Sequence, residues 1–207
     1  MRHSSGRIIR RGLLIGLFGM GAVEIAAAQP APTRVRGAIE RLDGTELKVK
    51  SREGADVTLT LPESARTVAV ARAQLSDIKP GSYVGTAAMV RPDGTLMALE
   101  VLIFPDTMRG AGEGHRPWDL LPESTMTNAT VSETVTRVDG QTLTLTYKDG
   151  QKTVIVPPEA PIVTFVPATR ADLKPGTRLM ATVTKGADGI ATANSVVVGK
   201  DGVDPPM

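Results

Sequence analysis

The sequence predicts an all-β protein that consists of two copies of one small module. Three observations predict it: a series of residues that occurs twice in the same order, alternation of apolar and polar residues, and many turn residues. Glycine and proline supply 21 and 15 of the 207 residues, and cysteine is absent. Such a composition is typical of short strands joined by tight turns. Without disulfides, the stability must come from packing.

The repeat has two spacings, 96 residues at first and then 95. At the first spacing, Arg41, Asp43, Gly44, Leu47, Gly54, Pro62 and Glu63 are matched by Arg137, Asp139, Gly140, Leu143, Gly150, Pro158 and Glu159. At the second, Asp77, Lys79, Pro80, Gly81, Asp93, Gly94, Ala98 and Val101 are matched by Asp172, Lys174, Pro175, Gly176, Asp188, Gly189, Ala193 and Val196. The two modules therefore cover residues 35–105 and 131–199, with a unique linker over 106–130 and a flexible tail over 200–207.

Alternating apolar residues predict the strands of each module. Leu47 and Val49 alternate with polar residues, and the second copy repeats the pattern at Leu143 and Leu145. Five Asp-Gly pairs predict hairpin corners, because glycine accepts a positive φ and aspartate caps the local backbone. These pairs are Asp43-Gly44, Asp93-Gly94, Asp139-Gly140, Asp149-Gly150 and Asp188-Gly189.

One short helical turn is predicted in each copy, over Ala71–Ser76 and Ala168–Leu173, ended by a Lys-Pro-Gly sequence. Each module then contains three strands, a short helix and two strands. That order in about 70 residues suits a small five-stranded barrel of the oligonucleotide/oligosaccharide-binding (OB-like) type. A sandwich is the alternative. The fold class is thus two tandem OB-like barrels joined by an ordered linker.

Residues 1–28 are predicted to be a signal peptide. Four arginines precede the apolar stretch Gly12–Val23. The small residues Ala26–Ala28 then allow cleavage before Gln29. An uncleaved anchor is less suitable, because Glu24 interrupts a stretch that is already short for a span. Arg10-Arg11 allows twin-arginine export as well as ordinary secretion. The protein is therefore expected in the periplasm or outside the bacterial cell, with no membrane span after cleavage.

Nucleic acid is not an expected partner. Removing residues 1–28 takes away four arginines and one glutamate, which leaves 20 basic and 21 acidic residues and a formal charge of −1. A single-strand binder requires stacking aromatics on a positive groove. In the repeat register, Tyr83, Phe104, Tyr147 and Phe165 are matched by Arg178, Gly199, Ser51 and Val70, so the copies share no aromatic position.

The linker contains the only histidine of the mature chain, His115, and the only tryptophan, Trp118. In the structural interpretation, Trp118 packs across the two barrels with Leu120 and Leu121, and Asp119 helps to order the linker. In a second interpretation, the linker is a site for a ligand or partner.

A third interpretation is a copper(I) site, because thioether and imidazole suit that ion. Its ligands would be Met108, His115 and Met126. Asn128 lies just beyond them, near the end of the linker, and completes the set of candidate linker residues. Methionines also fill gaps in cores, so packing remains the alternative for both thioethers.

Catalysis is not expected. A serine hydrolase would have to take Ser124, His115 and Asp119 from one flexible stretch, whereas such triads need rigid support. A zinc enzyme commonly needs several histidines, and no acidic pair stands out from the turn aspartates. No cofactor is expected.

The repeated Asp-Gly, Lys-Pro-Gly and Asp-Gly residues resemble an exported bacterial family of domains of unknown function. The resemblance covers both modules, Arg36–Phe104 and Ser132–Val198, and it implies small β-barrel repeats in the cell envelope. The linker, from Gly112 to Asn128, resembles that of relatives sometimes labelled as metal-transporter components. The resemblance supplies no catalytic residues.

The expected function is a non-enzymatic binding or scaffolding module of the bacterial envelope, whose partner is an envelope protein or a small ligand. The alternative is a periplasmic copper-type accessory protein that uses the methionines and histidine of the linker.

Expression of the full chain with its signal in a Gram-negative host should give a soluble periplasmic protein that starts at Gln29. N-terminal sequencing of the periplasmic fraction checks this result. Recovery of Met1 from the membrane fraction would instead mean that residues 1–28 remain as an anchor.

Overall fold

The computed structural model describes residues 32–137 and 140–205, and it is all-β, as the sequence predicted. Its only helices are three 3-10 helices of three residues each within this described part. Within residues 32–137 and 140–205, no helix is long and apolar enough to cross a membrane. The predicted signal peptide, residues 1–28, lies outside the described residues.

The same order of elements occurs in each half of the chain. The first half contains β1 (Thr33–Asp43), β2 (Glu46–Ser51), β3 (Asp56–Thr60), β4 (Arg66–Arg72), η1 (Leu75–Asp77), β5 (Tyr83–Val90) and β6 (Leu96–Ile103). The linker contains η2 (Asp106–Met108) and β7 (Gly114–Pro117). The second half contains β8 (Thr125–Arg137), β9 (Gly140–Tyr147), β10 (Gly150–Val156), β11 (Ile162–Pro167), η3 (Arg170–Asp172), β12 (Arg178–Lys185) and β13 (Ala191–Gly199). Each half thus has one strand more than the sequence pattern predicted, namely β4 and β11.

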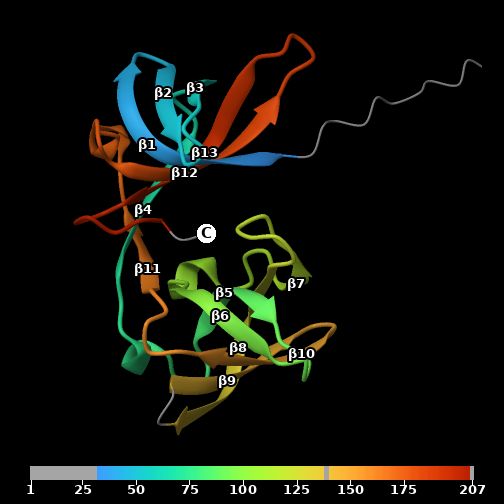
Figure 1. Ribbon diagram of the computed structural model, residues 1–207. Coiled ribbons are helices and arrows are strands. Elements are labelled where there is room, and N and C mark those ends of the chain that lie inside the picture. Colours follow the sequence, from blue (N-terminus) through green and yellow to red (C-terminus); the bar gives the residue numbers. More distant parts are fainter. Residues whose placement is uncertain (1–31, 138–139, 206–207) are drawn as a thin grey trace, which may run out of the picture.

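The lower lobe in Figure 1 is a closed five-stranded barrel. Its strands follow the order β8-β9-β10-β6-β5 and return to β8. All neighbours are antiparallel except β10 and β6, which are parallel and pair at Val154–Leu96 and Ile155–Met97. Three of these strands come from the second half of the chain and two from the first.

The upper lobe has the corresponding arrangement with the halves interchanged. Its strands follow the order β3-β2-β1-β12-β13, and a single parallel pair, Thr60–Thr192, joins β13 to β3. Here β1, β2 and β3 come from the first half and β12 and β13 from the second. We expected each copy, 35–105 and 131–199, to form a barrel of its own. The strand pairings differ from that expectation, because each lobe combines strands of both copies.

Two crossing strands, β4 and β11, carry the chain from one lobe to the other (Figure 1). They pair antiparallel with each other over five residue pairs, from Val163–Arg72 to Pro167–Val68. On their outer edges β4 pairs with β13 and β11 pairs with β6, both in parallel. Both segments are rich in β-branched residues, which favour an extended backbone over a turn that would fold each copy back on itself. One continuous sheet therefore passes through both lobes.

The hydrophobic core has three parts. The core of the upper lobe includes Leu47 and Leu59 from the first half together with Leu179 and Val196 from the second. The core of the lower lobe likewise combines both halves. A third cluster lies at the junction of the lobes and consists of Val70, Tyr83, Leu102, Phe104, Val163, Met180, Val197 and Val203. Because every core contains residues of both halves, neither half buries its apolar strand faces alone.

The C-terminal segment differs from the flexible tail that we expected over 200–207. In its described part, the amide of Lys200 donates to the carbonyl of Val70 at 2.9 Å. Val203 is 7% exposed and belongs to the junction cluster. This segment packs because Val203 supplies apolar surface where the two lobes meet.

Cutting the chain between Gly112 and Glu113 should give two fragments that fold poorly alone and associate one to one when mixed. Each fragment then lacks two strands of one lobe and three strands of the other. The apolar faces of its remaining strands therefore have no partner. Far-ultraviolet circular dichroism and analytical ultracentrifugation of the separate and mixed fragments check this outcome. Two fragments that each unfold cooperatively at the melting temperature of the intact chain would instead indicate barrels built from contiguous copies.

Candidate functional site

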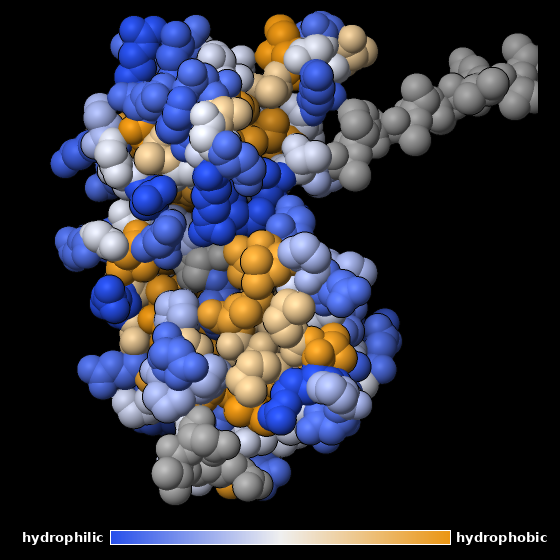
Figure 2. All heavy atoms as spheres, viewed as in Figure 1, coloured by the Kyte–Doolittle hydropathy of each residue, from blue (hydrophilic) through white to orange (hydrophobic). Residues whose placement is uncertain are grey.

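A cleft of about 460 Å³ lies where the linker meets both lobes. The upper lobe contributes Arg34, Met180, Thr182 and Ser195, the linker contributes Met108, Ala111, Gly112, Arg116 and Trp118, and the remaining walls are Phe104, Met126, Asn128 and Phe165. We call it the Arg–Trp cleft. Figure 2 shows hydrophobic side chains gathered on the lower lobe and hydrophilic side chains where the lobes meet. The cleft therefore combines apolar walls with two guanidinium groups.

Trp118 contacts two arginines through its ring. The guanidinium carbon of Arg34, on β1, is 3.7 Å from the centroid of the indole, and that of Arg116, on β7, is 5.4 Å away. Such contacts are favourable because the cation faces the negative side of the ring quadrupole. The indole Nε1–H is buried and has no hydrogen-bond partner among the residues that the structure describes. Trp118 thus joins the linker to the upper lobe and leaves one donor unused.

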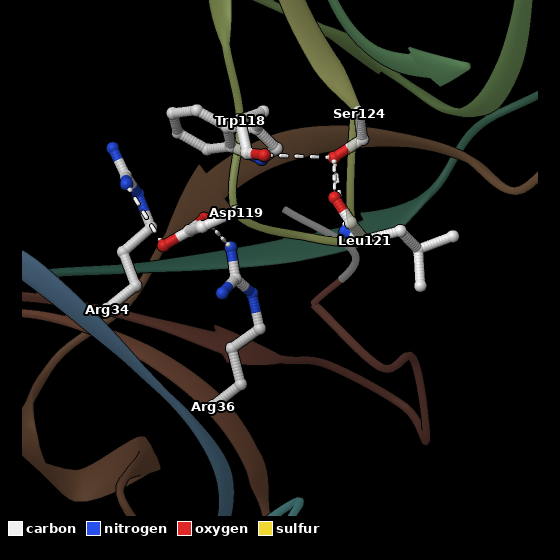
Figure 3. Close-up of polar contacts among 6 residues, drawn as sticks. All are labelled: Arg34, Arg36, Trp118, Asp119, Leu121 and Ser124. Carbon is white, nitrogen blue, oxygen red and sulfur yellow. Dashed lines mark hydrogen bonds and ion pairs between the residues drawn. The ribbon is translucent and has the colours of Figure 1, made fainter.

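Asp119 continues this contact with the upper lobe (Figure 3). Its carboxylate accepts from Arg36 Nη2 at 2.8 Å and from Arg34 Nη1 at 3.3 Å. Burial acts to raise the pKa of Asp119, but the hydrogen bond from Arg36 and the charges of both arginines hold it below its usual value. The carboxylate is therefore ionised at neutral pH and already engaged by two cations.

Ser124 shapes the turn that presents Trp118 and Asp119. Its Oγ lies 3.1 Å from the carbonyl oxygen of Trp118 and 2.8 Å from that of Leu121, and it accepts from the amide of Leu121 (Figure 3). Ser124 is 2% exposed, and the preceding Glu123 has a φ of 62° in the left-handed region. The hydroxyl is thus used within its own turn. Leu121, expected to pack between the lobes, is 47% exposed.

Asn128 fixes the other end of the linker. Its Nδ2 donates to the carbonyl of Ala111 at 3.0 Å, and the hydroxyl of Tyr83 donates to the same carbonyl at 3.2 Å. Asn128 is 7% exposed, and its Oδ1 would lie 2.7 Å from a Cβ at Gly85. A glycine at 85 is therefore required for this close approach. Asn128 acts as an anchor of the linker and forms part of the cleft wall.

Arg116 is the cation of the cleft that has no carboxylate partner among the described residues. Its Nη1 donates to the carbonyl of Gly112 at 2.8 Å. Burial lowers the pKa of Arg116 from its usual value, and the charge of Arg34 lowers it further. Two neighbouring guanidiniums, one of them half-buried and unpaired, are electrostatically unfavourable unless an anion lies between them.

The predicted soft-metal ligands are not all on one face. On the β7–β8 ladder, His115 pairs with Thr127 and Arg116 pairs with Met126. Because successive side chains of a strand point to opposite faces, His115 and Met126 lie on opposite sides of this ladder. His115 Nδ1 is 2.8 Å from Thr127 Oγ1, and burial, with Lys152 and Arg116, lowers the pKa of the imidazole.

Met108 and Met126 both line the Arg–Trp cleft, where Met180 joins them. Met126 is only 1% exposed, so its side chain serves mainly as packing. The sulfur of Met108 accepts from Arg66 Nη2 at 3.3 Å. Two of the three predicted ligands are therefore brought to one cleft, without the histidine.

Three aromatic residues from both halves of the chain meet at the junction, which the repeat register did not predict. The ring centroids of Tyr83 and Phe104 are 5.2 Å apart, and those of Phe104 and Phe165 are 5.7 Å apart. Exchange of strands between the lobes brings them together. Tyr83 and Phe104 are 3% and 9% exposed, so the cluster is a core rather than a surface for stacking bases.

Glu100, on β6, is a second functional candidate that the sequence analysis missed. It is 1% exposed, and its Oε1 has no hydrogen-bond partner within the described part of the chain. It lies in the wall of a second cleft of about 720 Å³ together with Arg52, Arg72 and Leu120. Burial raises the pKa of Glu100 to about 8, against the smaller effects of Arg36 and Arg52. The sequence indicates this residue by one feature: Glu100 is the only charged residue in the otherwise apolar segment from Leu96 to Phe104.

Comparisons with protein-family models, with curated proteins and with solved structures each found no match to this chain.

The free energy of unfolding should decrease as the pH rises from about 4.5 to about 8, and Glu100→Gln should remove most of this decrease. In that range the folded chain keeps the proton of Glu100, whose pKa is raised from 4.5 to about 8, while the unfolded chain has lost it. The change amounts to a few kcal/mol, since one pKa unit corresponds to about 1.4 kcal/mol. Urea unfolding at several pH values measures it.

Glu63→Gln, at an exposed turn position, is the matched control and should keep the pH dependence of the wild type. An unchanged slope in Glu100→Gln would show that Glu100 ionises normally.

Proposed function

We propose that this chain is an exported, non-enzymatic binding module of the bacterial cell envelope and that the Arg–Trp cleft is its ligand site. The observation that carries the proposal is the half-buried guanidinium of Arg116, which has no carboxylate partner in the described structure and lies beside Trp118 and Arg34. Binding sites typically have apolar walls with a few polar groups that fix orientation, and volumes of about 300–1,000 Å³. The cleft of about 460 Å³ has this character.

The fold supports the same proposal. We infer that each lobe is an OB-like barrel assembled from strands of both copies. In both lobes, three consecutive strands of one copy pair with the last two strands of the other, and the two sets meet at one antiparallel pair and one parallel pair. A greek-key barrel of five strands is a frequent support for ligand sites, although the fold alone specifies no ligand.

The side chains that a hydrolase would use favour binding over catalysis. Ser124 Oγ contacts the backbone of its own turn, Asp119 pairs with Arg34 and Arg36, and His115 contacts Thr127. A nucleophile, its base and the group that orients the base must lie within hydrogen-bond reach of one another. The three side chains have separate partners instead.

A periplasmic copper-type accessory protein is the second candidate, and Met108, Met126 and Met180 in one cleft favour it. Two guanidiniums in the same cleft oppose a cation, and the imidazole of His115 faces away from Met126. We therefore place binding of a non-metal ligand first.

Mature protein purified from a periplasmic fraction without an affinity tag should carry a small-molecule adduct that native mass spectrometry detects. The adduct should be lost from Ser195→Phe, because a larger side chain at this half-buried wall position fills the cleft. Asn194→Phe, at the exposed neighbouring position, is the matched control and should retain the adduct. An added mass equal to copper would support the accessory protein instead, and an adduct retained by both variants would place the ligand elsewhere.

A further inference from the structure

We infer that the ligand of the Arg–Trp cleft is an anionic amphiphile, a molecule with one negatively charged head group and an apolar body. This inference rests on the proposed function, because it names the chemical class that the same cleft would bind.

The lining of the cleft is positively charged. Arg34 and Arg116 are its ionisable side chains among the described residues, and neither an aspartate nor a glutamate lines it. Arg34 contacts the carboxylate of Asp119, but Asp119 also pairs with Arg36. A bound anion would therefore balance the positive charge of the cleft.

The donors that would hold the head group belong to Arg116, whose guanidinium is half-buried. Of the five N–H donors of a guanidinium, the structure gives Arg116 one contact, from Nη1 to the carbonyl of Gly112. The Nε1–H of Trp118, whose ring contacts the guanidinium of Arg116, has no acceptor in the described part of the molecule. Hydrogen bonds from a guanidinium to an anion are shorter and stronger than neutral ones, and a planar guanidinium suits carboxylate, sulfonate or phosphate oxygens.

The remaining walls suit an apolar body. Phe165 and Phe104 supply aromatic surface, and Met108 and Met180 supply flexible thioether side chains that adapt to ligands of irregular shape. Phe104 and Met180 belong to the junction cluster, and Met108 and Phe165 pack against it, so an apolar body in the cleft would extend the hydrophobic contact between the lobes. A purely inorganic anion would leave this surface in water, and a cation would meet two guanidiniums.

Two fluorescent probes with one carbon skeleton test the inference: anilinonaphthalene sulfonate, which is anionic, and phenylnaphthylamine, which lacks the sulfonate. Binding to the full mature chain is followed by quenching of Trp118, the only tryptophan in the sequence. The anionic probe should bind at least about tenfold more tightly, as one charge-assisted hydrogen bond would provide. Raising the salt concentration should weaken the anionic probe and leave the neutral one nearly unchanged.

The decisive variant is Arg116→Gln, which should reduce the affinity for the anionic probe about tenfold and leave the neutral probe within about twofold. Arg91→Gln, which removes the same charge at an exposed position on the lower lobe, should bind both probes as the wild type does. Thermal unfolding by circular dichroism verifies that both variants are folded. Ser195→Phe should abolish binding of both probes, because it fills the cleft.

The outcomes separate this inference from the proposed function. If the two probes bind equally well, and both are lost in Ser195→Phe, the cleft is a ligand site without selection for an anion and the inference is wrong. If neither probe quenches Trp118, or if Ser195→Phe binds both normally, the cleft is not a ligand site and the proposed function fails with it.

Discussion

The pairing of β4 with β11 is the contact on which the rest of the molecule depends. These two strands run antiparallel from Val68 to Arg72 and from Val163 to Pro167, and each continues the sheet of one lobe into the other. Seven extended residues span roughly 20 Å, enough to deliver the following strands to a different lobe. Once both copies cross in this way, β5 reaches β8 and β6 reaches β10, whereas β12 reaches β1 and β13 reaches β3. The mixed cores, the junction cluster and the clefts follow from this exchange.

Exchange also explains why a linker longer than a turn is retained between the copies. The chain leaves β6 and must enter β8 in the same lobe, and these strands lie on either side of β5. The linker covers this gap, pairs β7 with β8, and anchors itself through Ala111 to Tyr83 and Asn128. Its turn then reaches the opposite lobe, where Trp118 and Asp119 contact Arg34. One segment thereby joins both lobes and forms most of one side of the cleft.

Local features could be predicted from the sequence, and long-range pairings could not. The described Asp-Gly turns, the alternation at Leu47 and Leu143, and one short helical turn in each copy depend on neighbouring residues, and an all-β fold follows from them. Asp139, in one of the predicted corners, lies outside the described residues. The first helical turn lies at Leu75–Asp77, later than Ala71–Ser76, because β4 extends to Arg72. Whether β5 joins its own copy or the other cannot be inferred this way, because the alternation along a strand is the same in both cases. The single tryptophan of the sequence drew attention to Trp118 and the neighbouring Asp119. Their partner Arg34 lies on β1, and nothing in the sequence around Arg34 distinguishes it from other arginines. The repeat did not indicate Glu100, because a repeat is defined by matching residues and Glu100 has no matching residue in the second copy.

The position of Glu100 explains how two similar copies give two different clefts. At the second spacing of the repeat its counterpart is Ser195 on β13. Ser195 lines the Arg–Trp cleft, whereas Glu100 lines the larger cleft, so corresponding strand positions face two different hollows. At the Arg–Trp cleft, the small neutral side chain of Ser195 adds no negative charge opposite Arg116. At the larger cleft, a buried carboxyl faces Arg36 and Arg52, and its ionisation would oppose a bound anion as the pH rises. The repeated strands thus supply a common frame, and unmatched residues such as Glu100 and Ser195 make the clefts that they line differ in charge.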